Sequence, residues 1–110
     1  MSEHAFNPDE RRAVYRAIAE RRDMRRFVPD STVPPEVLGR LLQAAHAAPS
    51  VGLMQPWRFI RITDDALRGK IHALVDQERI HTADALGVRG DEFLALKVEG
   101  ILDCAELFVV

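Results

Sequence analysis

Apolar residues recur at helical spacing in the first half of the chain, and each run begins at a recognisable helix start. Asn7 and Glu10 form a capping box with a proline between them, which predicts a helix from there to about Arg22. A second helix is predicted to begin at Pro34-Pro35-Glu36 and to end at Pro49, because proline cannot continue a helix. The apolar stripes are formed by Val14, Ala17 and Ile18 in the first helix and by Val37, Leu38, Leu41, Leu42, Ala45 and Ala48 in the second.

The pattern of the second half is helical at first and then weakens. Asp64-Asp65 is a helix start, and the apolar spacing after it predicts a third helix. Over residues 80–91 the spacing is poor and Gly87 and Gly90 interrupt it, so we expect a mobile loop or lid there. A fourth helix is predicted over residues 92–103.

Two segments have the pattern of strands. Residues 57–63 alternate between two faces, with Trp57, Phe59 and Arg61 on one of them. Residues 107–110 are a continuous apolar run, which is typical of a strand buried on both faces. Because chain termini usually lie at the surface, we expect this sequence to be the N-terminal part of a longer protein, truncated inside a core strand.

Helices and strands in this mixed order predict an α+β fold, since a strict βαβ alternation is missing. The chain has 110 residues, which suits a single domain or part of one, so residues 1–110 are assigned to one domain. No apolar stretch approaches the roughly 20 residues that span a bilayer, and the polar N-terminus lacks the features of a secretory signal. With a single cysteine, Cys104, we expect a cytoplasmic protein without membrane attachment.

Positive charge is concentrated near the end of the first predicted helix. The net charge is −2, but Arg21, Arg22, Arg25 and Arg26 lie within six positions. Such a focused cluster suits a small anion, and its guanidinium groups would hold a phosphate through forked hydrogen bonds. Asp23 among them should stay ionised, because adjacent positive charge favours the carboxylate. The alternative is a solvated helix end whose cations offset the helix dipole.

A second candidate site is the uncharged segment of residues 49–57. It offers hydrogen-bonding groups from Ser50 and Gln55, a close backbone approach at Gly52, and an apolar surface from Leu53 and Met54. These features would suit the plane of an aromatic cofactor. An ordinary connection between a helix and a strand is the alternative.

Other site types have little support in the sequence. The four histidines show neither the i, i+4 pairing nor the acidic partners of a metal site, and Cys104 has no cysteine partner, so no metal is predicted. Residues 62–110 carry ten acidic and five basic residues, which argues against nucleic-acid binding.

Taken together, the two candidate segments resemble the flavin-binding half of the nitroreductase superfamily. The resemblance rests on Arg21-Arg22-Asp23-Met24-Arg25 with Phe27, followed by the segment of residues 48–57. It is closer to the branch that destroys its flavin, the 5,6-dimethylbenzimidazole synthases, and residues 96–101 also resemble that branch. Two positions favour this branch, because other nitroreductases tend to carry serine in place of Asp23 and asparagine in place of Leu53.

The resemblance implies a nitroreductase-like fold, a homodimer with FMN at the subunit interface, and a set of flavin-binding residues. That set is Arg21, Arg22, Asp23, Met24, Arg25, Pro49, Ser50, Val51, Gly52, Leu53 and Gln55. Arg21, Arg22 and Arg25 would hold the phosphate, the ribityl chain and the ring-edge oxygens, and Asp23 is the expected catalytic residue.

The resemblance also implies a reaction in which FMN is both cofactor and substrate. Reduced FMN, supplied by a partner reductase, and dioxygen would yield 5,6-dimethylbenzimidazole, the lower ligand of cobalamin, with release of erythrose 4-phosphate. The lid expected over residues 80–90 would exclude water during this reaction. Two alternatives remain open: an FMN-dependent NAD(P)H nitroreductase or related oxidoreductase, and a non-catalytic flavin-binding module.

Overall fold

A computed structural model describes residues 3–110. The elements are α1 (Pro8–Glu20), α2 (Pro35–His46), the 3-10 turn η1 (Val51–Leu53), β1 (Ile60–Ile62), α3 (Asp65–Leu86), the 3-10 turn η2 (Gly87–Arg89), α4 (Gly90–Leu94), α5 (Gly100–Asp103) and β2 (Leu107–Val109). Helices and a small sheet in this order confirm the predicted α+β class.

The helix starts follow the capping residues seen in the sequence. The backbone N–H of Glu10 donates to Asn7 Oδ1 at 2.9 Å, and the Asn7 N–H donates to Glu10 Oε2 at 2.8 Å, so the capping box is present. At the start of α3, Asp64 Oδ1 accepts a hydrogen bond from the Ala66 N–H at 2.9 Å. The first three predicted helices are therefore confirmed.

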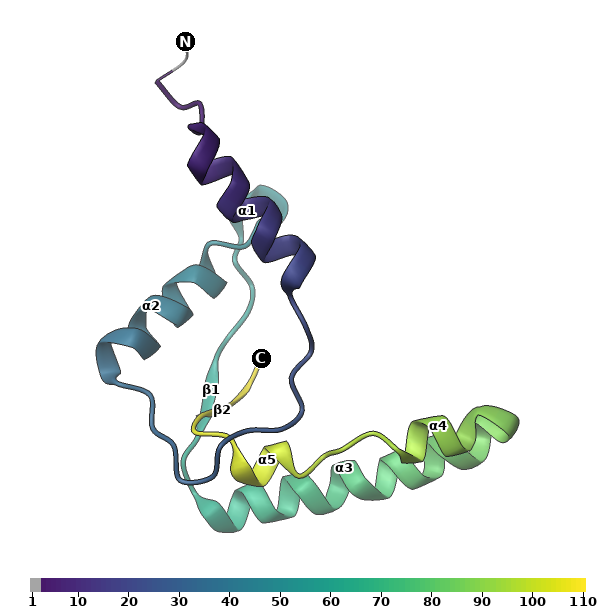
Figure 1. The fold of residues 1–110 in the computed structure, drawn as a ribbon. Coiled ribbons are helices and arrows are strands. Elements are labelled where there is room, and N and C mark those ends of the chain that lie inside the picture. The colour runs from purple at the N-terminus through teal and green to yellow at the C-terminus, as the bar shows by residue number, and fades with distance from the viewer. Residues whose placement is uncertain (1–2) are drawn as a thin grey trace.

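The predicted loop over residues 80–91 is wrong. Helix α3 continues to Leu86, and η2 then turns the chain directly into α4, which lies along α3 (Figure 1). The turn is tight because Gly90 lacks a side chain: a β-carbon there would lie 2.6 Å from the Ala83 carbonyl oxygen. Gly90 thus allows close packing of two helices, and a lid at residues 80–90 loses its structural basis.

The predicted fourth helix over residues 92–103 is also wrong as a single element. Two short helices, α4 and α5, occupy its ends, and residues 95–99 between them are irregular. The Val98 N–H donates to the Glu99 side chain at 3.2 Å, so a local side-chain hydrogen bond competes with helix formation at this point.

The sheet is smaller and more exposed than the sequence pattern predicts. Strands β1 and β2 pair antiparallel, with Ile60 opposite Val109 and Ile62 opposite Leu107. The strand predicted over residues 57–63 is limited to its last part, because only three residues of it find a partner strand. Val109 of β2 is 45% exposed, so β2 is not buried on both faces within the described part of the chain.

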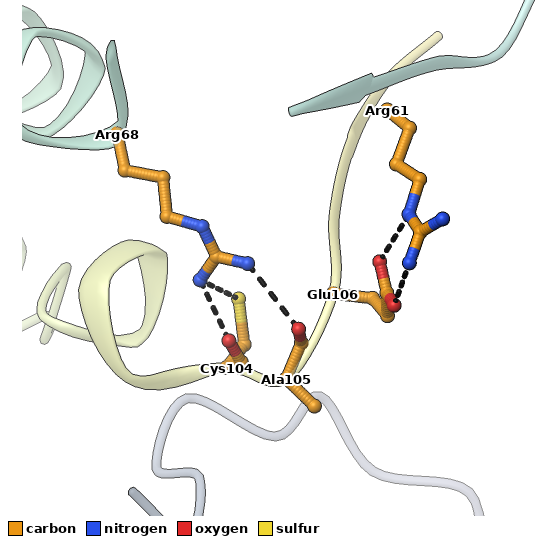
Figure 2. Close-up of polar contacts among 5 residues, drawn as sticks. All are labelled: Arg61, Arg68, Cys104, Ala105 and Glu106. Carbon is orange, nitrogen blue, oxygen red and sulfur yellow. Dashed lines mark hydrogen bonds and ion pairs between the residues drawn. The ribbon is translucent and has the colours of Figure 1, made fainter. Parts of the chain in front are cut away.

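Two arginines fix the C-terminal segment to the rest of the fold (Figure 2). Arg68 of α3 donates to the carbonyl oxygens of Cys104 at 2.6 Å and Ala105 at 3.3 Å, which satisfies backbone acceptors beyond α5. Arg61 of β1 forms a two-pronged pair with Glu106, at 2.9 and 2.6 Å. These contacts place α5 on α3 and bring β2 beside β1.

The arrangement is open. Helices α1 and α2 lie away from the α3–α5 layer (Figure 1), and the radius of gyration is 18.4 Å, against about 13 Å for a compact domain of this size. In residues 3–110, only Ile62 and Ala83 form a buried apolar core. None of the helices in this part of the chain combines the length and apolar character needed to cross a membrane.

Candidate functional site

The arginine segment, residues 21–28, follows directly after α1 and has no regular secondary structure. Arg21 Nη1 lies 3.3 Å from Asp23 Oδ1, an ion pair whose two side chains are 74% and 81% exposed. Arg22 turns back onto the helix end, where its Nη1 donates to the carbonyl oxygens of Ala19 at 3.2 Å and of Arg21 at 2.9 Å. Arg22 thus contacts the end of the helix, as expected if the arginine cluster is a solvated helix end.

Arg25 and Arg26 differ from these two, because neither guanidinium group makes a hydrogen bond or ion pair within residues 3–110. Arg25 lines a mainly apolar cavity of about 370 Å³ together with Met24 and residues of the α5–β2 region. Free, charged donors beside a cavity are the groups in this segment most available to an anionic ligand.

The arginine segment packs against α5 through Phe27. A β-carbon at Gly100 would lie 2.8 Å from Phe27 Cε2 and 3.0 Å from the Arg25 carbonyl oxygen. Only the missing side chain of Gly100 allows this approach. Residues 97–100 therefore belong to the surroundings of Arg25, although the sequence analysis assigned no site residue there; their resemblance to the synthase branch was the available signal.

The second candidate segment, residues 49–57, is held to α2 by its own hydrogen bonds. Ser50 Oγ accepts the Gln55 N–H at 3.0 Å, and Gln55 Nε2 donates to the His46 carbonyl at 3.2 Å. Trp57 Nε1 donates to His46 Nδ1 at 3.0 Å, with the two rings edge to face. These hydrogen bonds fix the loop, and they use the side chains of Ser50 and Gln55 for contacts within the protein.

The tip of this loop presents apolar side chains on a strained backbone. Val51 is 87% exposed and Leu53 is 83% exposed, so neither packs within the described chain. Gly52, Leu53 and Gln55 have positive φ values of 59°, 55° and 45°. For Leu53 and Gln55 this left-handed conformation costs energy, and such strain is common where a loop is shaped for a ligand. Pro49 precedes this tip at the end of the α2 connection.

The two candidate segments are held by different parts of the fold. No hydrogen bond or ion pair within residues 3–110 joins residues 21–25 to residues 49–55. The first segment contacts α5, whereas the second is anchored to His46 of α2. The predicted assignment of both segments to one flavin site stays a prediction.

Two acidic groups near the arginine segment favour their charged forms. Backbone N–H groups of Glu99 and Val98 hold the pKa of the Glu99 carboxyl below its ordinary value, and Lys97 adds to this effect. The hydrogen bond from Arg61 lowers the pKa of Glu106, and the same pair raises the pKa of Arg61. In the described part of the chain, no three His, Cys, Asp or Glu residues gather into a possible metal site.

The available donors and surfaces fit the parts of a flavin mononucleotide. A phosphate needs cationic, forked donors, and the arginine segment has two unpaired guanidinium groups in Arg25 and Arg26. An isoalloxazine ring needs an apolar surface, and Val51 and Leu53 are exposed to provide one.

Comparison with known proteins finds both the family and the synthase branch that the motifs resemble. The model of the Nitroreductase family matches residues 18–110. A 5,6-dimethylbenzimidazole synthase from Rhodospirillum rubrum is 39% identical over 100 residues, covering 87% of this chain and 46% of that protein. One from Rhodobacter capsulatus is 35% identical over 97 residues, covering 87% of this chain and 47% of that protein.

A more distant relative is iodotyrosine deiodinase 1 from Rattus norvegicus, 33% identical over 64 residues, covering 58% of this chain and 22% of that protein. The chain spans about half the length of the two synthases. The resemblance seen in the motifs is confirmed, and because the family match extends from α1 to β2, the chain belongs to the nitroreductase family.

Proposed function

We propose that the full-length protein is a 5,6-dimethylbenzimidazole synthase, and that residues 1–110 are the N-terminal part of its single nitroreductase-like domain. It would convert reduced FMN, with dioxygen, to 5,6-dimethylbenzimidazole and erythrose 4-phosphate, and the carbon and nitrogen atoms of the pyrimidine ring would leave as separate fragments. The observation that carries the proposal is the similarity to synthases over 87% of this chain, which includes both candidate segments. We further propose a cytoplasmic homodimer that receives reduced FMN from a separate reductase.

In this proposal the arginine segment binds the phosphate end of FMN. Arg25 is the strongest candidate, since its guanidinium group has no partner in the described chain and lies beside a cavity. Arg21 and Arg22 would bind ribityl or ring-edge oxygens, which requires Arg22 to exchange its carbonyl contacts with Ala19 and Arg21 for contacts with the ligand. Such an exchange is inexpensive for an exposed side chain.

The loop of residues 49–55 would pack beside the isoalloxazine ring. Its hydrogen bonds to His46 keep its backbone in place before the ligand binds, and this preorganisation reduces the entropy cost of binding. Burial of the exposed Val51 and Leu53 side chains under the ring would remove apolar surface from water.

The bound flavin supplies the reducing equivalents and the carbon skeleton of the product. Asp23 is the group of this chain proposed to move a proton, at the ribityl carbon next to the ring. Its carboxylate lies 3.3 Å from Arg21 in an exposed ion pair, and a carboxylate can accept a proton in general base catalysis.

A reductive oxidoreductase that uses NAD(P)H is the second candidate. The similarity to iodotyrosine deiodinase 1 is the reason to test it, because part of the matched region also occurs in a protein that is not named a synthase. The two functions differ in what happens to FMN: the reductase releases it intact after each turnover, whereas the synthase consumes it.

The test is to incubate the full-length protein aerobically with reduced FMN in one sample, and with oxidised FMN and NADPH in another. A synthase makes 5,6-dimethylbenzimidazole in the first sample and oxidises little NADPH in the second. Rapid NADPH oxidation with complete recovery of FMN would assign the protein to the second candidate. Binding of FMN with neither reaction would indicate a non-catalytic flavin-binding module.

A further inference from the structure

A second, charged cavity lies beside the arginine segment, and no pattern in the sequence predicts it. Its volume is about 400 Å³, and its lining comes from two separate parts of the chain. The lining residues are Arg25, Arg26, Phe27, Lys97, Glu99 and Asp103. Lys97 enters this group from the irregular connection between α4 and α5, more than 70 positions away from Arg25.

The three cations of this cavity make no short polar contact, although Lys97 interacts electrostatically with Glu99 at longer range. None of Arg25, Arg26 and Lys97 makes a hydrogen bond or ion pair with another group in residues 3–110. Other cations of residues 3–110, such as Arg40 and Arg58, also make no ion pair, so the distinguishing feature of these three is that they line one cavity. Three like charges around one cavity repel one another, so a bound anion would relieve an unfavourable arrangement.

The two carboxylates in the lining do not cancel this charge. By formal charge, three basic side chains face two acidic ones, so the lining has a net positive charge. Glu99 is also occupied locally, because its Oε2 accepts the Val98 N–H at 3.2 Å. A phosphomonoester carries about −1.5 to −2 charges near neutral pH, so it would offset the excess positive charge of the lining and leave a net charge of about −0.5 to −1.

The contact between Phe27 and Gly100 holds the two halves of the cavity together. It places the backbone of Arg25 against the first residue of α5, three positions after Lys97. The cavity therefore depends on tertiary packing, and its cations cannot be recognised as a group from the sequence.

We propose that Lys97 is an additional phosphate-binding residue, which acts with Arg25 and Arg26 on the phosphomonoester of FMN. This inference rests on the proposed function, since it assigns a further ligand-binding residue to the same flavin site. It predicts that Lys97 contributes to recognition of the phosphate and contributes nothing to recognition of the ring.

The test compares FMN with riboflavin, which has the same ring and ribityl chain but no phosphate. Dissociation constants of both oxidised flavins would be measured by fluorescence titration of the full-length protein and of Lys97→Gln. We expect Lys97→Gln to weaken FMN binding about tenfold and to leave riboflavin binding unchanged, because a lost charge-assisted contact has about this effect. Lys97→Arg should restore most of the affinity for FMN.

Lys70 is a matched control, because it is the other lysine of the chain and is exposed on α3 outside this cavity. Lys70→Gln removes the same charge and should change neither dissociation constant. Equal weakening of both flavins in Lys97→Gln, or no change in FMN binding, would overturn the assignment of Lys97 while leaving the proposed function standing. Failure of the unmodified protein to bind either flavin would overturn both.

Discussion

The ring of Phe27 lies over Gly100 so closely that a β-carbon at position 100 would come within 2.8 Å of Cε2. The contact joins the irregular arginine segment to α5, and within residues 3–110 no hydrogen bond between side chains reinforces it. Packing at this one position therefore determines where Arg25 lies. We expect Gly100→Ala in the full-length protein to lower the free energy of unfolding by about 1–2 kcal/mol, the usual cost of overpacking.

Gly100→Ala should also weaken FMN binding, because the Arg25 backbone must move. Gly39→Ala is the matched control: Gly39 lies in the interior of α2, and a β-carbon there would meet no atom within 4 Å. Alanine at that position should raise stability by about 0.5–1 kcal/mol without affecting FMN. Equal effects of the two variants in chemical denaturation would refute the role given to the Phe27–Gly100 contact.

Arg22→Ala tests whether Arg22 leaves the helix end to bind the ligand. If it binds FMN, the variant should lose about 1–3 kcal/mol of binding free energy, the contribution of a charge-assisted contact. If its role is limited to the carbonyl oxygens of Ala19 and Arg21, fluorescence titration will give an unchanged dissociation constant. Arg11→Ala, in the exposed first half of α1, is a suitable control.

Asp23→Asn separates binding from chemistry. The amide keeps the size of the side chain but removes the carboxylate that would accept a proton. FMN affinity should stay within about twofold, since the exposed pair with Arg21 contributes little. Formation of 5,6-dimethylbenzimidazole should fall below detection by mass spectrometry. A variant that makes product at the unmodified rate would remove Asp23 from the mechanism.

Leu53→Gly probes the strained tip of the loop. Leucine at a φ of 55° is unfavourable, and its side chain is exposed in the described chain, so glycine should raise stability by about 0.5–1 kcal/mol. The same change removes an apolar surface expected under the flavin ring, and affinity for both FMN and riboflavin should fall. Loss of stability, measured by thermal unfolding, would show that the Leu53 side chain packs elsewhere.

Glu106→Gln tests the pair between β1 and the segment before β2. The hydrogen bond from Arg61 lowers the pKa of Glu106 in the folded protein, so the carboxylate stabilises the fold above its ordinary pKa of about 4.5. This stabilisation is lost as the pH falls through the lower, folded-state value. The difference in unfolding free energy between Glu106→Gln and the unmodified protein should be constant near neutral pH and shrink below about pH 4.5. A difference independent of pH down to 3 would contradict the pair.

Local sequence signals predicted the helix starts well. The capping residues Asn7, Glu10 and Asp64 act through neighbours within three positions, so the sequence contains all the information needed. The region after Ile80 was predicted wrongly because Gly87 and Gly90 were interpreted as loop residues. Gly90 is instead required by packing on Ala83, which no local pattern reveals.

The candidate site was also predictable only in part, because local sequence patterns do not show tertiary contacts. The arginine segment was found from its charge alone, but its division into Arg22, which contacts the helix end, and Arg25, which is unpaired, depends on the fold. Lys97 and Gly100 reach the arginine segment only through tertiary contacts, so their part in the site could not be derived from the sequence.

The most direct test of the central claim follows the carbon atoms of the flavin. Uniformly ¹³C-labelled FMN would be reduced, mixed aerobically with the full-length protein, and analysed by mass spectrometry for labelled 5,6-dimethylbenzimidazole and remaining FMN. The account predicts fully labelled product in an amount equal to the FMN that disappears, above a control without protein. Quantitative recovery of labelled FMN with no labelled product would contradict it.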